Sequence, residues 1–215
     1  MSGLGQMMTG GAGATSRARP DDDFYATPGP VTEALLASPW RPAKTARVWE
    51  PACGDGAIVS VLRRHGYDVA ASDLNDHGAP AEHGARIGVD FIGAPNDGGF
   101  HAVVTNPPFN VAEQFIKHAV VTLWLPYVAM YLKPTYWQAV SRWRLFHARR
   151  PAAVLALTWR PDFQGRGAPT MDGIWCVWRG TQTCTQYDLL AKPGGGLFGG
   201  PGETEDAANT SVVAE

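Results

Sequence analysis

The chain has 215 residues, a formal net charge of −2 and a hydrophobic content of 45%. This length is typical of one domain, and the apolar content excludes a wholly disordered protein. No apolar run approaches the roughly 20 residues that a membrane helix needs. The N-terminus lacks the basic and apolar regions of a secretory signal, so we expect a cytoplasmic protein.

Cysteines and histidines give no sign of a disulfide framework or a metal site. The three cysteines, Cys53, Cys176 and Cys184, are odd in number and lack CxxC spacing. The six histidines form no HxxxH or HExxH pattern. We therefore expect no metal and no disulfide-based fold. Because the net charge is negative, a nucleic-acid partner requires a locally basic face. Nothing in the sequence sets the oligomeric state.

Low-complexity segments flank the part of the chain that has regular patterns. Residues 1–22 are rich in small and polar residues, and residues 193–215 are glycine-rich and then acidic. Both are predicted to be disordered arms. One folded domain is predicted over residues 23–192.

Short apolar runs alternate with helix-compatible stretches along this domain. Strands are predicted at Ala46–Glu50, Asp68–Ser72, Arg86–Val89, Ala102–Thr105, Tyr127–Tyr131, Ala153–Thr158 and Ile174–Trp178. Helices are predicted at Val31–Ser38, Ala57–His65, Val111–Leu125 and Tyr136–Ala148. Short strands separated by helices are typical of parallel βαβ units. The predicted fold class is therefore α/β, a three-layer sandwich around a mostly parallel sheet of about seven strands.

A glycine loop follows the first predicted strand and opens the next helix. It reads VWEPACGDG from Val48 to Gly56. Gly54 and Gly56 allow a tight turn close to a ligand, and the helix N-terminus offers free amides to an anion. A dinucleotide-binding fingerprint has Gly or Ala three residues after its second glycine, where Val59 stands here, and Pro51 does not fit it either.

Two acidic residues complete this candidate ligand site. Glu50, at the end of the first strand, suits a cationic amine. Asp73 ends the second strand, 19 residues after Gly54, where a carboxylate can bind two ribose hydroxyls. A ligand with a ribose, an amine and a carboxylate but no pyrophosphate fits S-adenosylmethionine. The alternative is an ordinary glycine turn with Asp73 as a surface cap.

The turn Asn106-Pro107-Pro108-Phe109 ends the strand predicted at Ala102–Thr105. Prolines cannot continue a strand ladder, so the turn fixes the Asn106 side chain and the Pro107 carbonyl as two acceptors. Phe109 follows as a flat apolar plate. Together these groups suit a planar group with an NH2, because two acceptors favour the more nucleophilic form of an exocyclic amine. The alternative is a structural turn with Phe109 in the core.

These motifs resemble the class I S-adenosylmethionine-dependent methyltransferases, specifically the N6-adenine DNA methyltransferases of the small phage or prophage type. The resemblance covers about Phe24 to Arg179, and it implies a Rossmann-like fold and catalytic roles for Asn106, Pro107, Pro108 and Phe109. It also implies cofactor contacts for the residues that match the family's other motifs. These are Tyr25, Thr27, Pro28, Glu50, Pro51, Gly54, Gly56, Asp73, Asp90 and Phe91.

The function implied is direct, in-line transfer of a methyl group from S-adenosylmethionine to the N6 amine of adenine in DNA, in a prokaryotic or phage-infected cell. The target adenine would be flipped out of a duplex. The alternatives are cytosine N4, adenine in RNA or a protein glutamine as acceptor, or a non-catalytic DNA-binding or anti-restriction protein. Asn106 and Phe109 favour adenine, because the resembling cytosine enzymes begin this motif with Ser and the glutamine enzymes end it with Tyr.

A basic segment follows the catalytic motif. Residues 135–166 contain six arginines and one acid, a local excess of +5, interleaved with tryptophans. Such residues contact phosphates and stack on bases. The alternative is a solvated helix face with its tryptophans packed inward. The predicted nucleic-acid contacts are Arg142, Arg144, Arg149, Arg150, Gln164 and Arg166.

The chain has no room for a large target-recognition domain after the catalytic motif. Only the loop from Arg160 to Asp172 is free for base contacts, where Gln164 suits adenine and Arg166 suits guanine. We therefore expect a short or weak recognition sequence.

Overall fold

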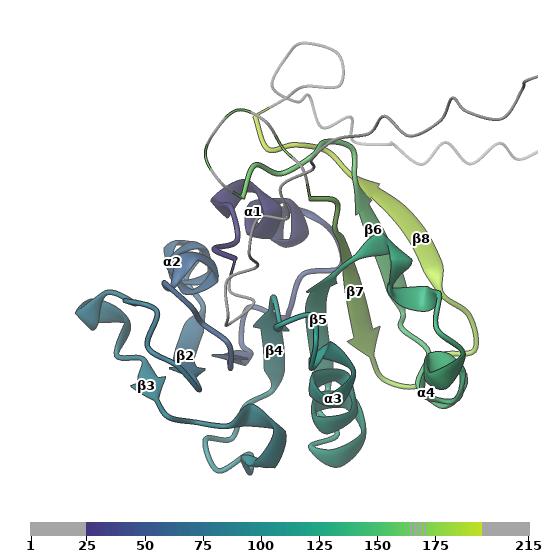
Figure 1. The fold of residues 1–215 in the computed structure, drawn as a ribbon, viewed down its shortest axis with the longest axis horizontal. Coiled ribbons are helices and arrows are strands. Elements are labelled where there is room, and N and C mark those ends of the chain that lie inside the picture. Colours follow the sequence, from purple (N-terminus) through teal and green to yellow (C-terminus); the bar gives the residue numbers. More distant parts are fainter. Residues whose placement is uncertain (1–24, 164, 166, 168, 170, 195–215) are drawn as a thin grey trace, which may run out of the picture.

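A computed structural model describes residues 25–163, 165, 167, 169 and 171–194. In this part of the chain one mixed sheet has the strand order β3-β2-β1-β4-β5-β7-β6-β8 (Figure 1). The arm predicted at residues 1–22 lies outside the described residues, as does all but the start of the arm predicted at 193–215. Their disorder stays a prediction.

All seven predicted strands are present, with ends shifted by at most two residues. The strands are β1 Arg47–Glu50, β2 Asp68–Asp73, β3 Arg86–Ile87, β4 Ala102–Thr105, β5 Tyr127–Leu132, β6 Ala153–Leu157, β7 Ile174–Arg179 and β8 Gln186–Leu190. The α-helices are α1 Gly29–Ala37, α2 Ala57–Arg64, α3 Ala112–Ile116 and α4 Trp143–Ala148. Shorter 3-10 turns lie at Ala81–His83, Phe91–Gly93, Pro134–Trp137 and Val140–Arg142, and a π-helical turn lies at Lys117–Thr122.

The order of the strands reverses between β1 and β4. From β1 the chain builds outward through β2 and β3, and from β4 it builds the other way. Only β7 is antiparallel to its neighbours, β5 and β6; the other pairings are parallel. Ligands of open α/β sheets bind beyond the carboxyl ends of the strands at such a switch point. Glu50 and Asn106 stand at this point, at the ends of β1 and β4.

Two hydrophobic clusters cover the two faces of the sheet, which makes three layers. Helices α1 and α2 pack on one face, where Leu35 and Leu62 join Val104 of β4. Helices α3 and α4 pack on the other, where Ile116 and Leu145 join the neighbouring Val103. The predicted three-layer, mostly parallel α/β fold is therefore confirmed (Figure 1).

The sheet has one strand more than the seven predicted. Strand β8 pairs in parallel with β6 at the edge of the sheet, with Gln186 beside Ala153 and Leu190 beside Leu157. Of its five residues only Leu190 is buried. An edge strand without a buried face has neither the alternation nor the apolar run by which strands are found in a sequence.

The helix predicted over Tyr136–Ala148 is wrong in its first half. Two 3-10 turns occupy this stretch and only α4 is α-helical, because Ala139 is extended at φ −145° and ψ 121°. Trp137 and Phe146 have ring centroids 4.4 Å apart. A straight α-helix would separate these residues by about 13 Å along its axis, at 1.5 Å per residue. The chain folds back so that both aromatic rings reach the same cluster.

The helix predicted over Val111–Leu125 is also only partly α-helical. After α3 it widens into the π-helical turn, in which the Leu123 amide donates to the His118 carbonyl at 2.8 Å. The His118 ring is buried in this turn, packs edge-on against Phe91 at 5.0 Å and bonds to the Ala94 carbonyl at 2.9 Å. This buried ring ties the helix to the loop after β3.

Candidate active site

A cavity of about 320 Å³ opens at the carboxyl ends of β1, β2 and β4. Ten of the fourteen residues that the sequence predicts for catalysis or cofactor binding line it. They are Tyr25, Thr27, Pro51, Asp73, Asp90, Phe91, Asn106, Pro107, Pro108 and Phe109. The fold therefore brings five separate sequence segments to one place.

The two glycines of the loop after β1 shape the cavity wall without lining it. The Gly54 amide donates to Asp73 Oδ2 at 2.9 Å, which ties the loop to the end of β2. Gly56 precedes α2 with φ +84°, a left-handed conformation that favours glycine. The ring of His83 lies directly against Gly56, where a Cβ atom would collide with it. Position 56 is therefore closed to larger residues for two independent reasons.

Asp73 accepts hydrogen bonds from the loops after β1 and β2, and it also lines the cavity. Its Oδ1 accepts from the Asn75 amide at 3.0 Å, its Oδ2 accepts from Gly54, and the residue is only 7% exposed. The His77 Nε2 atom lies 3.9 Å from Oδ1. A carboxylate has about four lone-pair positions, so each oxygen retains capacity for a hydroxyl group.

Glu50 lies behind the cavity wall and is fully buried. Its Oε1 accepts from the Ala52 amide at 3.2 Å, while Oε2 and the neighbouring Thr105 hydroxyl each lack a well-formed hydrogen bond among the described residues. Burial raises the pKa of this carboxyl well above its usual value; the nearby Thr105 hydroxyl and the Ala52 amide lower the pKa, and the Asp73 charge raises it. That Glu50 meets a cationic amine of the ligand stays a prediction.

Pro28 does not line the cavity either. It precedes α1, and its carbonyl accepts from the Val31 amide at 2.9 Å, so it fixes the start of that helix. The three residues directly before it, Tyr25 to Thr27, line the cavity.

The Asn106 side chain is fixed by the segment before α1. Its Nδ2 donates to Thr27 Oγ1 at 3.0 Å and to the Tyr25 carbonyl at 3.4 Å. Its Oδ1 is buried and has no hydrogen-bond partner in the part of the chain that the structure describes. An unpaired buried acceptor costs free energy of about 1–3 kcal/mol, and such atoms are found where a ligand supplies the partner.

Phe109 stands next to a second aromatic ring and a lysine. The Tyr25 ring is 6.3 Å away at a tilt of 31°. The Lys133 Nζ atom lies 4.2 Å from the centre of the Phe109 ring. Lys133 follows β5, the strand beside β4. Lys133 was not predicted from the sequence, because only the strand order places it beside the Asn106–Phe109 turn.

Other residues that line the cavity were also missed. They are Ala26, Ala52, Cys53, Asp55, Ala57, Ile58, Leu74, Asn75, His77, Val89, Ile92, Val111 and Phe115. Asn75 and His77 follow β2 directly, so the rule that ligands bind beyond strand ends was a signal that could have found them. Phe115 comes from α3 and carries no such signal. Cys53 is buried here, and burial with the nearby Glu50 and Asp73 carboxylates raises its pKa to about 12.

The predicted nucleic-acid contacts differ in their surroundings, because some lie on the protein's own aromatic rings and others are exposed to solvent. Arg142 is bound within the protein: it lies 4.0 Å from the Tyr136 ring, donates to the Tyr136 carbonyl at 2.7 Å and approaches Glu113 at 3.6 Å. Arg149 lies 3.6 Å from the Trp124 ring. Arg144 is exposed on α4.

Arg149 and Arg150 lie far from the Asn106–Phe109 turn. They precede β6, whereas Asn106 follows β4, and the pairings through β5 and β7 make β4 and β6 parallel. The two arginines therefore lie at the amino end of β6, whereas the cavity opens at the carboxyl ends of the parallel strands.

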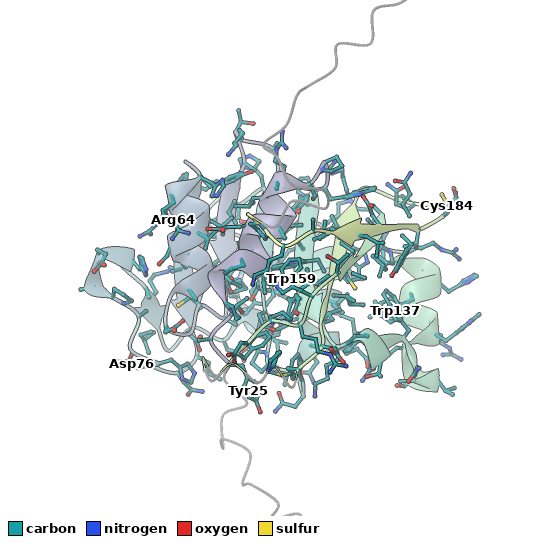
Figure 2. All side chains as sticks on the ribbon, turned by 90° about the horizontal axis from the view of Figure 1, so that it is seen from above. Tyr25, Arg64, Asp76, Trp137, Trp159 and Cys184 are labelled. Atoms are coloured by element: carbon teal, nitrogen blue, oxygen red, sulfur yellow. The ribbon has the colours of Figure 1, made fainter. Side chains whose placement is uncertain are left out.

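Gln164 and Arg166 lie outside the described residues, so their base contacts stay predictions. Arg160, at the start of the same loop, pairs with Asp172 at 2.9 Å. Figure 2 shows Trp137 at the other end of the molecule from Arg64 and Asp76, with Trp159 between.

No helix among the described residues is long and apolar enough to cross a membrane. The same residues include no group of three or more His, Cys, Asp or Glu side chains that could hold a metal ion.

No protein-family model matches the sequence, and no curated protein matches it. Among solved structures, the chain is similar to the M protein of the type I restriction enzyme EcoKI, with 17% identity, a TM-score of 0.53 and coverage of 80% of this chain and 49% of that one. It is also similar to a proposed RNA methyltransferase from Pyrococcus horikoshii, with 15% identity, a TM-score of 0.56 and coverage of 72% and 85%.

A third similar structure is the modification subunit of a proposed type I restriction enzyme from Vibrio vulnificus, with 13% identity, a TM-score of 0.50 and coverage of 81% and 49%. The chain spans about half the length of the two restriction-enzyme subunits. The fold is that of the Rossmann-like methyltransferases. At these identities the likeness shows the fold alone, and the small phage or prophage type stays a prediction.

Proposed function

We propose that this chain transfers a methyl group from S-adenosylmethionine to the N6 amine of adenine in DNA. The observation that carries the proposal is the buried, unpartnered Oδ1 of Asn106, held beside Phe109 in the same cavity as Asp73. The Asp73 side of this cavity suits a ribose, and the Asn106 side suits an amine. The Rossmann-like methyltransferase fold agrees with that pairing.

The residues present fit S-adenosylmethionine, which supplies a methyl group on a positively charged sulfur when bound. The free lone pairs of Asp73 would accept from two ribose hydroxyls. Asp90 is engaged through Oδ1 with the Ile92 amide at 3.0 Å, and with Phe91 it lines the part of the cavity assigned to the cofactor adenine. Glu50 lies behind the cavity wall with a raised pKa, and a cationic amine bound near it would favour its ionised form.

The catalytic turn would act by binding and orienting the acceptor amine. Asn106 Oδ1 and the Pro107 carbonyl would accept its two hydrogens, which turns the nitrogen lone pair towards the methyl group. Phe109 would stack on the base. Bound S-adenosylmethionine would supply the methyl group, and the amine held by Asn106 and Pro107 would take it as the methyl–sulfur bond breaks and would give up one proton to water. Placement of the two reactants supplies much of the rate.

Nucleic-acid adenine is the acceptor that this arrangement favours. The resemblance to modification subunits of restriction enzymes supports DNA as the substrate. The likeness to a proposed RNA methyltransferase makes adenine in RNA the second candidate. We place the activity in one domain, residues 23–192, working in the cytoplasm of a prokaryotic or phage-infected cell.

The test is methylation-sensitive sequencing of DNA from bacterial cells that express the full chain. The matched control is Asn106→Ala, which retains the cofactor wall. We expect N6-methyladenine, at a short motif, in cells with the unaltered chain and none with the variant. Unmethylated DNA in both, with methyl groups in RNA of the expressing cells, would replace DNA by RNA as the substrate.

A further inference from the structure

The orientation of the Asn106 amide is decided by its partners. The Tyr25 carbonyl can only accept, so the group that faces it at 3.4 Å must be the NH2. The second hydrogen of that NH2 goes to Thr27 Oγ1 at 3.0 Å. Both donors of the side chain are therefore occupied within the protein, and Oδ1 is left as an unpaired acceptor, among the described residues, on a residue that lines the cavity.

Thr27 provides the shorter of these two hydrogen bonds from a rigid position. The residue is only 4% exposed, and Pro28 fixes the backbone immediately after it by starting α1. An amide turned by 180° has almost the same shape, since its oxygen and nitrogen differ little in size. The turned amide would present two N–H donors to the incoming NH2 and would repel it.

We propose that Thr27 is a positioning residue, which holds the Asn106 amide so that Oδ1 accepts the target amine. Thr27 acts through Asn106 and is 79 residues away in sequence. This inference rests on the proposed function, because it assigns Asn106 Oδ1 to the acceptor amine. It adds that the part of the cavity that would receive the target amine is complete only while the segment before α1 is in place.

Thr27 also lines the cavity, so a simple packing role against the cofactor is the competing explanation. Two substitutions separate the roles. Thr27→Val keeps the shape of the side chain and removes the hydroxyl, whereas Thr27→Ser keeps the hydroxyl and removes the methyl group. A positioning role makes the valine variant defective and the serine variant normal. A packing role gives the reverse order.

The kinetic experiment measures kcat for DNA methylation and the Kd for S-adenosylhomocysteine in the three proteins. We expect Thr27→Val to lower kcat by up to about 100-fold, because a misplaced reacting group costs that much, with Kd changed only a few-fold. Thr27→Ser should retain kcat. In an Asn106→Ala background, Thr27→Val should have no further effect. Normal turnover in Thr27→Val, or a loss confined to Kd, would overturn the proposal.

A second experiment tests the contact without any acceptor substrate. The full chain has five asparagines, and in protein labelled with ¹⁵N-asparagine the side-chain signals missing in Asn106→Ala belong to Asn106. We expect two separate, slowly exchanging NH2 signals that persist in Thr27→Ser and exchange fast in Thr27→Val. Unchanged signals in Thr27→Val would overturn the positioning role. If the unaltered chain methylates no DNA, the proposed function fails, while these signals still decide the role of Thr27.

Discussion

In the half of the sheet formed by β3, β2, β1 and β4, polar side chains at the strand ends face one cavity. In the half formed by β5, β7, β6 and β8, cationic side chains lie on the protein's own aromatic rings. Asp73 and Asn106 represent the first arrangement. Arg142 on Tyr136 at 4.0 Å and Arg149 on Trp124 at 3.6 Å represent the second.

The two halves differ in where their unpartnered polar atoms lie. Asn106 Oδ1 and Glu50 Oε2 in the first half are buried and unpaired among the described residues, and Asn106 lines the cavity. In the second half the Tyr131 and Tyr136 hydroxyls and Arg142 Nε are also buried without a hydrogen bond in this part of the chain, but none of these three residues lines the cavity. Arg142 nevertheless has a ring, a carbonyl and a carboxylate as neighbours. Unpaired buried acceptors destabilise a protein unless a ligand completes them. Because its unpaired acceptor belongs to a residue that lines the cavity, the first half has the features of a ligand site, and Arg142 has those of a structural contact.

The largest effect is expected from Asn106→Ala in the first half. Loss of a preorganised group at the reacting centre costs about 10²–10³ in rate. The Kd for S-adenosylhomocysteine should stay within a few-fold, because we propose that Asn106 contacts the acceptor and not the cofactor. Single-turnover kinetics and calorimetry measure the two quantities. Full activity in the variant would reject the amine-binding role of the turn.

Gly56→Ala tests the loop between β1 and α2, which shapes the cavity wall in the first half of the sheet. The left-handed conformation at φ +84° costs an alanine about 1–2 kcal/mol, and the His83 ring adds a collision. The control is Gly66→Ala, at φ +78° with open space around it. Urea unfolding should show a larger loss for Gly56→Ala, and His83→Ala in that background should reduce the difference. Equal losses at the two positions would mean that His83 moves aside freely.

Asp73→Ala should weaken cofactor binding by about 1–3 kcal/mol, because hydroxyl groups are left unpaired in the pocket. The Gly54 and Asn75 amides also lose their acceptor. Asp73→Asn retains one acceptor oxygen and should lose less. Calorimetry with S-adenosylhomocysteine measures both variants. An unchanged affinity in Asp73→Ala would make Asp73 a loop anchor only.

Glu50→Gln should stabilise the ligand-free protein at neutral and alkaline pH. Burial raises the folded-state pKa of Glu50 above its unfolded value, so its contribution to stability is present below the unfolded pKa and is lost as pH rises towards the folded pKa. The Tm advantage of the variant should therefore grow from about pH 5 to about pH 8. The control is Glu33→Gln, a surface partner of Arg64 at 2.8 Å. A constant Tm difference across this range would show that Glu50 does not titrate on unfolding.

The smallest effects are expected from substitutions of two arginines in the second half, one of which should change stability and the other DNA binding. Arg142→Ala should lower the unfolding free energy, since the side chain packs on Tyr136 and Glu113, and should leave DNA binding unchanged. Arg144→Ala, at an exposed position, should leave stability unchanged and reduce the salt slope of DNA binding by about one unit if it meets a phosphate. Identical behaviour of the two variants would remove the distinction between the halves.

The first half could be predicted from sequence because its chemistry is tied to strand ends. Gly54, Asp73 and Asn106 each sit at or just after a recognisable buried strand, and parallel strands end at the same edge of the sheet. The second half depends on contacts that local patterns do not contain. The fold-back that joins Trp137 to Phe146 and the position of Lys133 beside Phe109 follow from tertiary packing and strand order.

The prediction of nucleic-acid contacts from arginine content had a different weakness. Composition gives the charge of a segment but not the direction of its side chains. Arg142 and Arg149 therefore looked the same in sequence as Arg144, although the first two lie on aromatic rings and the third is exposed.

The most direct measurement is to incubate the purified full chain with methyl-labelled S-adenosylmethionine and duplex DNA, and to identify the labelled nucleoside after complete digestion. Asn106→Ala serves as the control. We expect the label in N6-methyldeoxyadenosine, and none with the variant. Label in methylcytosine, or equal labelling by the variant and the unaltered chain, would contradict the assignment of the cavity to adenine N6 methylation.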